Sequence, residues 1–364
     1  MALEVMTGFS GSYAPEDVTF LLKPIAMAAT DVAAKEAAIQ SGRRHYSEMI
    51  APETIPDQDY LALYHAALAR NGARLAQDVA SLAARIAGQR PGGEIVLVSL
   101  ARAGTPIGVL LARTLRAWGH RASHYSISII RDRGLDRVAL AHIAARHDPR
   151  DAVFVDGWTG KGAIAGELRA SLAARSHGFA AELAVIADPA GQADFAATDD
   201  DYLIASGLLN GIVSGLVSRS VLNDEVVGSG DFHACVTYPH YAHADLSRAF
   251  VDAIAPLAAA AAPRPVADHT GRRAALMAGC EDMVQALLAR AGTRDRNRIK
   301  PGIAEATRAL LRRMPERLLV RDPQDADVAH LLHLAVAHRI PVEPLGESSH
   351  YRAVAIIRGL GNEA

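Results

Sequence analysis

Apolar side chains recur at intervals of three and four along residues 57–87, with polar residues between them. This spacing places the apolar positions on one face, so it predicts a long amphipathic helix. A short and nearly continuous apolar run, EIVLVSL, follows at 94–100, directly after a Pro-Gly-Gly turn. Such a run is typical of a strand that is buried on both sides of a parallel sheet.

The same two patterns alternate further along the chain. Helical spacing recurs at 106–118 and 163–176. Strand-like apolar runs lie between these stretches at 123–130 and 152–155, and another follows them at 182–187. Strands that alternate with helices predict an α/β fold with a parallel sheet, right-handed crossovers and helices on its faces. Ligands of such sheets bind beyond the carboxyl ends of the strands, so the loops after the strands are the places to look for chemistry.

A break in the pattern divides the chain. Residues 255–267 read APLAAAAAPRPVA, and the Pro-Arg-Pro cannot continue a helix that the alanine run ends. We therefore expect two domains, residues 1–262 with the parallel sheet and residues 268–364 as a smaller α/β unit. The length agrees with this division, because 364 residues are enough for about two domains.

Composition and charge add a few constraints. The chain has two cysteines, Cys235 and Cys280, so a disulfide framework is not expected. A secretory signal and a membrane-length apolar stretch are both missing, and we expect a cytoplasmic protein without a membrane partner. From Arg264 onward, 16 basic residues stand against 12 acidic ones, although the whole chain has a net charge of −2. This part is therefore the candidate for contact with a polyanion.

The segment VFVDGWTGKG at 153–162 carries the clearest chemical signal. An apolar strand ends at Asp156, a glycine-rich turn follows, and a helix then begins. Glycines let backbone N–H groups converge on an anion, and a helix N-terminus adds unsatisfied donors. Asp156 is suited to accept hydrogen bonds from sugar hydroxyls or to hold a metal ion. The candidate phosphate-binding residues are Gly157, Thr159, Gly160, Lys161 and Gly162.

The spacing separates this segment from two common nucleotide-binding patterns. It is two residues shorter than a Walker loop, it lacks that loop's final hydroxyl, and it is not a GxGxxG turn. The alternative is a tight glycine-rich turn with an incidental lysine, which is common between a strand and a helix.

A second candidate loop follows the first predicted strand, in SLARAGTP. Its candidate residues are Ser99, Arg102, Ala103 and Gly104. Gly104 lets the backbone approach a diphosphate, and Arg102 offers a planar fork of charged donors. The alternative is a turn with a surface arginine.

A third loop follows the strand predicted at 123–130. Arg131 and Arg133 flank an aspartate there. They either clamp a phosphate as a mobile loop closes over the site, or form a solvated, ion-paired loop. The three loops follow strands of one predicted sheet, so their order along the chain supports one shared site.

Together these segments resemble the type I phosphoribosyltransferases. Residues 153–162 are similar to the PRPP motif of that family, with Gly157 where a second carboxylate is usual and a loop about one residue shorter. The Arg-Ala-Gly segment is similar to the pyrophosphate loop of the uracil-type enzymes. The resemblance implies that PRPP or a related ribose phosphate binds with Mg²⁺ and that a base-like acceptor is glycosylated. It also implies catalytic roles for Asp156, Arg131 and Arg133.

A more specific resemblance comes from SYAPEDVTFLLK, DGWTGKG, LNGIVSGLVSRS and DFHACVTY, which lie within residues 8–255. These segments are similar to the phosphoribosyltransferase-like family of tellurite-resistance stress operons, which implies a stress-response pathway to a nucleoside-like metabolite. That family also carries the label cysteine protease StiP, for which Cys235 is the alternative nucleophile, with His233, His240 and His243 nearby. A nucleophilic cysteine needs a base that lowers its pKa, and a buried thiol is the other interpretation. The histidines lack the usual zinc spacing, so no metal site is expected.

The chain from Lys300 onward, beginning KPGIAEATRALLRRMPERLLVRD, is similar to the Pelota-type RNA-binding domain. The resemblance implies RNA as a partner. Basic residues beside a glycine turn and a helix N-terminus can bind a phosphate backbone, and a solvated basic helix face is the alternative. The candidate RNA contacts are Arg296, Arg298, Lys300, Gly302 and Arg308.

Three functions remain open at this point. The first is a phosphoribosyltransferase, the second is a cysteine protease, and the third is a ribonucleotide sensor that binds its ligand without turnover and binds RNA through its second domain. Assembly into a homo-oligomer also remains open.

Overall fold

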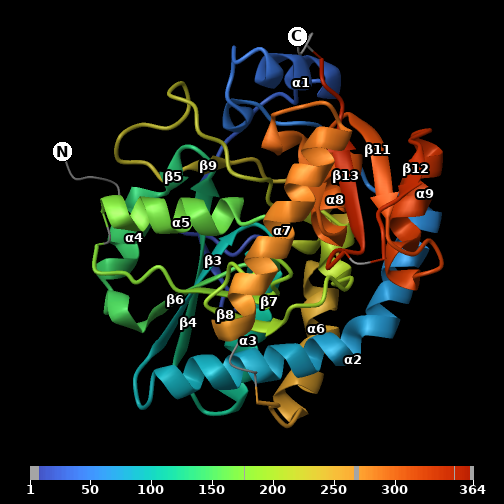
Figure 1. The fold of residues 1–364 in the computed structure, drawn as a ribbon. Coiled ribbons are helices and arrows are strands. Elements are labelled where there is room, and N and C mark those ends of the chain that lie inside the picture. The colour runs from blue at the N-terminus through green and yellow to red at the C-terminus, as the bar shows by residue number, and fades with distance from the viewer. Residues whose placement is uncertain (1–7, 176, 266–269, 348, 361–364) are drawn as a thin grey trace.

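A parallel sheet forms the centre of the larger domain (Figure 1). The computed structural model describes residues 8–175, 177–265, 270–347 and 349–360. The strand order is β1-β4-β3-β6-β7-β8 with parallel pairing throughout, and a short strand, β5, joins β4 in antiparallel orientation. The predicted parallel sheet is thereby confirmed. The strands are β1 (Thr19–Leu21), β3 (Ile95–Ala101), β4 (Ala122–Ile130), β5 (Gly134–Leu135), β6 (Ala152–Val155), β7 (Leu183–Ala187) and β8 (Phe195–Thr198).

The sheet builds an apolar core on each face, because successive residues of a strand point to opposite sides. Leu97 and Val155 belong to the core under α2, α3 and α6. Val98 and Phe154 belong to the core under α4 and α5. The helices expected near 57–87, 106–118 and 163–176 are confirmed as α2, α3 and α5. The helices of this domain are α2 (Gln58–Gln89), α3 (Gly104–Ala117), α4 (Arg137–Ala144), α5 (Ala163–Ala174) and α6 (Ser247–Ala260).

The C-terminal domain is a small α/β unit beside the main sheet, coloured orange to red in Figure 1. Its strand order is β10-β13-β11-β12, and β13 runs antiparallel to both of its neighbours. The predicted smaller α/β domain is confirmed. Its elements are α7 (Thr270–Arg290), β10 (Ile299–Pro301), α8 (Ile303–Arg312), β11 (Pro315–Val320), α9 (Ala329–Ala337), β12 (Val342–Pro344) and β13 (Ala353–Ile357).

A helix that the hydrophobic pattern did not predict, α1 (Val32–Gln40), lies against the C-terminal domain. Asp31 caps it by accepting hydrogen bonds from two backbone N–H groups. Glu36 forms an ion pair with Arg313 at 2.5 Å, and Gln40 donates a hydrogen bond to the backbone oxygen of Arg358 at 2.8 Å. Because its partners are polar and distant in sequence, α1 carries little of the apolar periodicity that reveals a helix.

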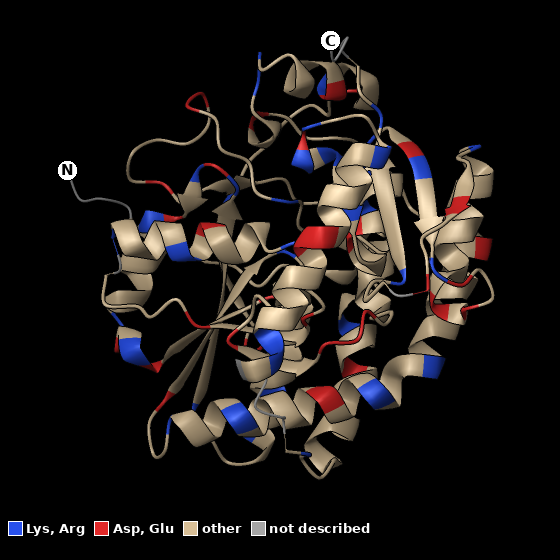
Figure 2. Ribbon diagram, in the orientation of Figure 1, with Lys and Arg blue, Asp and Glu red and all other residues tan. Residues whose placement is uncertain are grey.

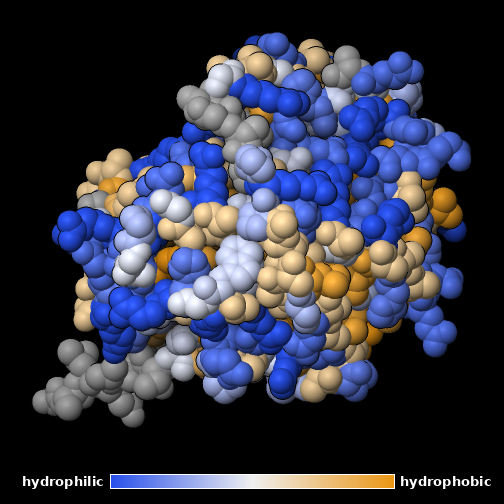
Figure 3. Space-filling view, turned by 90° about the horizontal axis from the view of Figure 1, so that it is seen from below, coloured by the Kyte–Doolittle hydropathy of each residue, from blue (hydrophilic) through white to orange (hydrophobic). Residues whose placement is uncertain are grey.

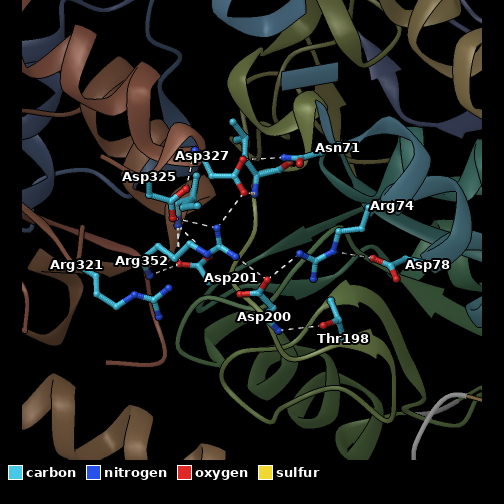
Figure 4. A network of polar contacts seen from close by, with 12 residues as sticks. Asn71, Arg74, Asp78, Thr198, Asp200, Asp201, Arg321, Asp325, Asp327 and Arg352 are labelled. Atoms are coloured by element: carbon cyan, nitrogen blue, oxygen red, sulfur yellow. Dashed lines mark hydrogen bonds and ion pairs between the residues drawn. The ribbon is translucent and has the colours of Figure 1, made fainter. Parts of the chain in front are cut away.

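A network of charged residues joins the two domains (Figure 4). Arg352, just before β13, binds Asp200 at 2.7 Å and Asp327 at 3.1 Å, and Asp200 also binds Arg74 of α2 at 2.8 Å. Buried Asp201 accepts a hydrogen bond from the backbone N–H of Ile303 at 3.0 Å. Asp201 lies in the larger domain and Ile303 is the first residue of α8. A carboxylate of one domain therefore caps a helix of the other.

Lys and Arg are interspersed with Asp and Glu along both domains (Figure 2). Apolar side chains lie between hydrophilic ones on the face seen in Figure 3. Among the described residues, no helix is long and apolar enough to cross a membrane. The larger domain's last helix, α6, ends at Ala260 and α7 begins at Thr270, on either side of the expected domain boundary.

Candidate functional site

A cavity of about 430 Å³ lies where the end of β6 and the start of α5 meet the C-terminal domain and α1. A smaller cavity of about 190 Å³ shares Asp156, Arg219, Arg308 and Arg312 with it. Basic side chains dominate the larger cavity. They are Lys35, Arg131, Lys161, Arg219, Arg298, Lys300, Arg308, Arg312 and Arg313, against the carboxyl groups of Asp156, Asp295 and Glu305.

Asp156 lies at the floor of both cavities, directly after β6. One of its carboxyl oxygens accepts a hydrogen bond from the backbone N–H of Gly157 at 2.8 Å. Burial raises the pKa of Asp156 to about 7, and the nearby Arg308 opposes that rise. The carboxyl group can therefore exchange a proton near neutral pH, and its second oxygen is available to a ligand's hydroxyl groups.

The glycine-rich loop brings the start of α5 to the cavity. Gly162, the N-cap residue of α5, has a φ of +85° and no side chain with which to cap the first turn of the helix. Ala163, Ile164 and Ala165 of that turn line the cavity. Unsatisfied N–H groups at a helix start, together with the helix dipole, favour an anion at this place. The segment has the predicted order of strand, glycine-rich turn and helix, and its binding of a phosphate stays a prediction.

Two polar side chains of this loop have partners within the protein. The hydroxyl of Thr159 donates a hydrogen bond to Asp188 at 2.5 Å. The ammonium of Lys161 donates one to the backbone oxygen of Ile299, in the C-terminal domain, at 2.5 Å. Both residues line the cavity, but their hydrogen bonds hold the loop in place and attach it to the second domain.

The C-terminal domain covers the loop closely. The hydroxyl of Tyr351 donates a hydrogen bond to the backbone oxygen of Gly160 at 2.5 Å. A Cβ atom on Gly160 would lie 2.9 Å from the Cγ of Glu305. A larger residue at this position would therefore force the side chain of Glu305 in α8 to move.

The loop after β3 was expected to offer Ser99 and Arg102 to a diphosphate, but both side chains bind groups of the protein instead. Arg102 is buried, and its guanidinium binds Glu53 at 2.5 and 3.1 Å and the backbone oxygen of Val217 at 2.6 Å. The hydroxyl of buried Ser99 donates a hydrogen bond to the backbone oxygen of Gly104 at 3.0 Å. These two side chains stabilise the fold. Arg102 and Ala103 nevertheless line the smaller cavity. This loop therefore forms part of the wall of the smaller cavity.

The two arginines of the loop after β4, Arg131 and Arg133, differ in whether they reach the cavity. Arg131 lines the larger cavity, donates a hydrogen bond to the side chain of Asn297 at 2.8 Å and lies 5.3 Å from the centre of the Tyr46 ring. Arg133 forms an ion pair with Glu48 at 3.0 Å and is not among the residues that line either cavity. Only Arg131 therefore reaches the site in this conformation.

Four basic residues that no motif marked line the larger cavity: Lys35, Arg219, Arg312 and Arg313, of which Arg313 is ion-paired with Glu36. Lys35 of α1 is only 5% exposed, yet its ammonium has no hydrogen bond or ion pair with any described residue. Burial, together with the charges of Arg219 and Arg312, lowers the pKa of Lys35 to about 7. Arg219 donates hydrogen bonds to the backbone oxygens of Tyr46 and Met49, and burial lowers its pKa to about 10.

Arg312, the last residue of α8, is the third. Its Nε is buried and has no hydrogen-bond partner among the residues described. Burial lowers its pKa, and the charge of Arg102 adds to that effect. The sequence carried one signal for this residue, the Arg-Arg pair at the end of an amphipathic helix, but it did not show that Arg313 is paired with Glu36 while Arg312 has no such partner among the described residues.

The residues expected to contact RNA lie in different places: some line the cavity, and Arg296 is exposed. Lys300 and Arg308 face the cavity, and Arg308 lies 4.7 Å from the centre of the Trp158 ring. Arg298 donates hydrogen bonds to the backbone oxygen of Ile357 and to Glu316. Exposed Arg296 is ion-paired with Glu281, and Gly302, with a φ of +93°, precedes the buried start of α8. Of this set, Arg296 is the one with an exposed side chain.

Cys235 lies away from both cavities, on the short strand β9 (Ala234–Cys235), which pairs with β2 (Lys23–Pro24). Its side chain is fully buried, and burial raises its pKa to about 12. The nearby His233 shares a hydrogen bond with Ser128 at 2.8 Å. His240 and His243 are exposed. Among the described residues, no three His, Cys, Asp or Glu side chains gather as a metal site.

Comparison with known proteins gives one family match, one domain match and one similar relative. Residues 11–255 match the family "Tellurite-like stress resistance cysteine protease StiP", and residues 278–359 match the PELOTA RNA binding domain. The protein named "Cysteine protease StiP" from Acinetobacter baylyi is 43% identical over 97% of this chain and 95% of its own length.

Among solved structures, two of a hypoxanthine phosphoribosyltransferase from Trypanosoma cruzi are similar. One is 17% identical with a TM-score of 0.28 and covers 46% of this chain and 81% of the other. The second, in complex with the product IMP, is 15% identical with a TM-score of 0.27 and covers 48% and 91%. These scores are too low to bear on the chemistry of the cavity. The sequence matches are decisive, and this chain belongs to the StiP family and carries a C-terminal Pelota domain.

Proposed function

We propose that the cavity between the domains binds a phosphorylated ribose such as PRPP and that the chain transfers its ribosyl group to a base-like acceptor. The observation that carries this proposal is the cavity itself, in which nine basic side chains surround an uncapped helix start and one carboxyl group after β6. A volume of about 430 Å³ suits one small ligand rather than a polymer. Such an excess of positive charge favours a ligand with several phosphate oxygens.

The residues take roles that follow from their positions. The first-turn N–H groups of α5 would hold the 5-phosphate, and Asp156 would accept hydrogen bonds from the ribose hydroxyls. In the reaction, the bond from C1 to the diphosphate oxygen breaks, a bond from C1 to an acceptor nitrogen forms, and the acceptor loses a proton to solvent. The basic side chains would stabilise the negative charge that develops on the departing diphosphate.

The proposal includes Mg²⁺ bound together with the diphosphate. Mg²⁺ in such sites is held by one or two carboxylates plus substrate phosphates, so Asp156 is sufficient as its ligand from the protein. The ion would supply charge neutralisation for the leaving group. The side chain of Arg102 has no part in this proposal, because Glu53 and Val217 occupy its guanidinium.

The test is isothermal calorimetry of PRPP with Mg²⁺, followed by assays of pyrophosphate release with candidate bases. We expect wild type to bind and Asp156→Asn to bind much more weakly, with Asp224→Asn, an exposed carboxylate, as the matched control. Loss of binding in the first variant alone supports the site. Absence of binding to wild type overturns the proposal. Binding without pyrophosphate release for any base would instead make the chain a sensor.

A second candidate function is carried by the name of the family, cysteine protease. The buried thiol of Cys235 and its raised pKa oppose a nucleophilic role in the conformation described. The decisive comparison is peptide hydrolysis by wild type, Cys235→Ala and Cys280→Ala. Hydrolysis that disappears only in Cys235→Ala would establish the protease. Equal hydrolysis by all three, or none by wild type, would exclude Cys235 as the nucleophile.

The match to a Pelota RNA binding domain supports RNA as a further partner. Because Lys300 and Arg308 face the cavity, RNA would have to use the outer surface of the domain, where Arg296 is exposed. A gel-shift titration with structured RNA, on wild type and Arg296→Gln, tests this proposal. RNA binding that is equal in both would exclude Arg296 from the contact.

A further inference from the structure

Lys35 and Arg312, two basic side chains in the larger cavity, have no hydrogen bond or ion pair with a described residue, and Lys300 is a third such group in the same cavity. Lys35 belongs to α1 and is 5% exposed, and its ammonium forms no hydrogen bond or ion pair there. Arg312 ends α8 of the C-terminal domain, and its Nε is buried without a hydrogen-bond acceptor. Most buried ammonium and guanidinium groups in proteins have such partners, so these two are exceptions that ask for an explanation.

The carboxylates that could neutralise them are engaged elsewhere. Glu36, the neighbour of Lys35, forms two hydrogen bonds with Arg313 at 2.5 and 2.7 Å. Glu53, whose charge acts on Arg312, forms the bidentate pair with Arg102. Lys35 and Arg312 therefore have no carboxylate in hydrogen-bonding contact among the described residues, although Glu36 and Glu53 attract them at longer range.

An uncompensated buried cation is unfavourable unless something else supplies the opposite charge. Arg219, the third basic group of this corner, binds backbone oxygens, which carry no net charge. The larger cavity is open to all three side chains. Arg312 and Arg219 also line the smaller cavity, beside Ala101, Arg102 and Ala103. An anion that neutralises these side chains would therefore bind in the space between α1, α8 and the loop after β3.

We propose that Lys35 and Arg312 form an anion subsite that binds a diphosphate group, so that the C-terminal domain completes the ligand site of the larger domain. In the reaction proposed above, on which this assignment of the group rests, the diphosphate is the leaving group of the ribosyl donor. Arg312 thereby takes the place of Arg102, whose guanidinium is neutralised by Glu53. The position of α8 is set by Asp201 of the larger domain, which caps its first turn at 3.0 Å.

The experiment is calorimetric titration of the full chain with inorganic pyrophosphate and, separately, with ribose 5-phosphate. The variants are Lys35→Gln and Arg312→Gln, and exposed Arg43→Gln, close to α1, is the control of equal charge change. We expect each of the first two to weaken pyrophosphate binding about ten-fold or more, since each loses charge-assisted hydrogen bonds. Ribose 5-phosphate affinity should stay within about two-fold, because its phosphate would lie at α5.

A second readout separates a local effect from misfolding. Without ligand, both substitutions remove an unpaired buried charge, so the melting temperature should be equal to or above that of wild type. Pyrophosphate should raise the melting temperature of wild type and Arg43→Gln but not of the two cavity variants.

The outcomes distinguish this inference from the proposed function. Pyrophosphate binding that depends on Lys35 and Arg312, in a protein that never turns over PRPP, would support the subsite and reject the transferase. Pyrophosphate binding that is unchanged in both variants, or absent from wild type, would overturn the subsite. A melting temperature that falls well below that of wild type in both Lys35→Gln and Lys35→Met would also overturn it, because the cation would then be stabilising the fold.

Discussion

Arg102 and Glu53 form a bidentate ion pair at 2.5 and 3.1 Å, with side chains only 4% and 11% exposed. Burial by itself would raise the pKa of Glu53, but the charges of Arg102 and Arg312 hold it below its usual range. The pair joins the loop after β3 to the segment that follows α1. An arginine in a loop that resembles a diphosphate-binding motif therefore acts in this protein as a structural residue.

Glu53→Gln should destabilise the protein by about 3 kcal/mol, because it leaves the buried guanidinium of Arg102 without its counter-charge. Urea unfolding followed by circular dichroism measures this. The control is Glu281→Gln, which breaks an exposed pair with Arg296 and should cost less than about 1 kcal/mol. Equal losses in the two variants would contradict the structural role of the Arg102–Glu53 pair.

The raised pKa of Asp156, about 7 against 3.8 in the unfolded chain, predicts a pH-dependent stability. Between these values the folded state binds more protons than the unfolded state, so the contribution of Asp156 to stability falls as the pH rises from about 4 to about 7. Asp156→Asn removes this contribution. The melting temperature of the variant minus that of wild type should therefore increase across this range. A difference that is flat with pH would show that Asp156 has an ordinary pKa.

Lys35, whose pKa is about 7, should take up a proton when pyrophosphate binds. A bound anion favours the charged ammonium and raises that pKa, so at pH 7.5 part of the population becomes protonated. Calorimetry in two buffers with different ionisation enthalpies gives the number of protons taken up. Because pyrophosphate itself titrates, the comparison is with Lys35→Gln, which should take up fewer protons. The same number in both proteins would place the anion away from Lys35.

Asp201→Ala should weaken pyrophosphate binding although Asp201 does not line the cavity. Its carboxylate caps α8 through Ile303 and also accepts a hydrogen bond from the backbone N–H of Arg352 at 2.9 Å. Loss of a cap costs about 1 kcal/mol, and the start of α8 would lose its fixed place. Thermal unfolding and the pyrophosphate titration measure the two effects. Destabilisation with full affinity would mean that Arg312 is positioned independently of this cap.

Cys235 should react slowly with iodoacetamide in the folded protein. Burial raises its pKa to about 12, so the thiolate is scarce and inaccessible at pH 8. Mass spectrometry of the native and the urea-unfolded protein compares the two rates at this residue. Fast labelling of the native protein would reveal an accessible thiolate and would favour the protease function.

The sequence by itself determined the four central strands of the parallel sheet, β4, β3, β6 and β7, and three of its helices, α2, α3 and α5. Apolar runs such as 94–100 and the periodicity of 57–87 report burial directly, and both became the expected elements, β3 and α2. The segment 153–162 also indicated where the candidate site lies, because a carboxylate at a strand end and a glycine turn before a helix are local features of the sequence.

Only the tertiary structure decided which charged residues serve the site. Arg102 fitted the motif for a ligand contact but is paired with Glu53, while Lys35 and Arg312 matched no motif and face the cavity unpaired. The reason is physical. The role of a charged side chain depends on the opposite charge nearest to it, and in this protein that partner lies on a segment far away in the sequence. Pairing of this kind is settled when segments distant in the sequence come together in the fold, and no periodicity records it in advance.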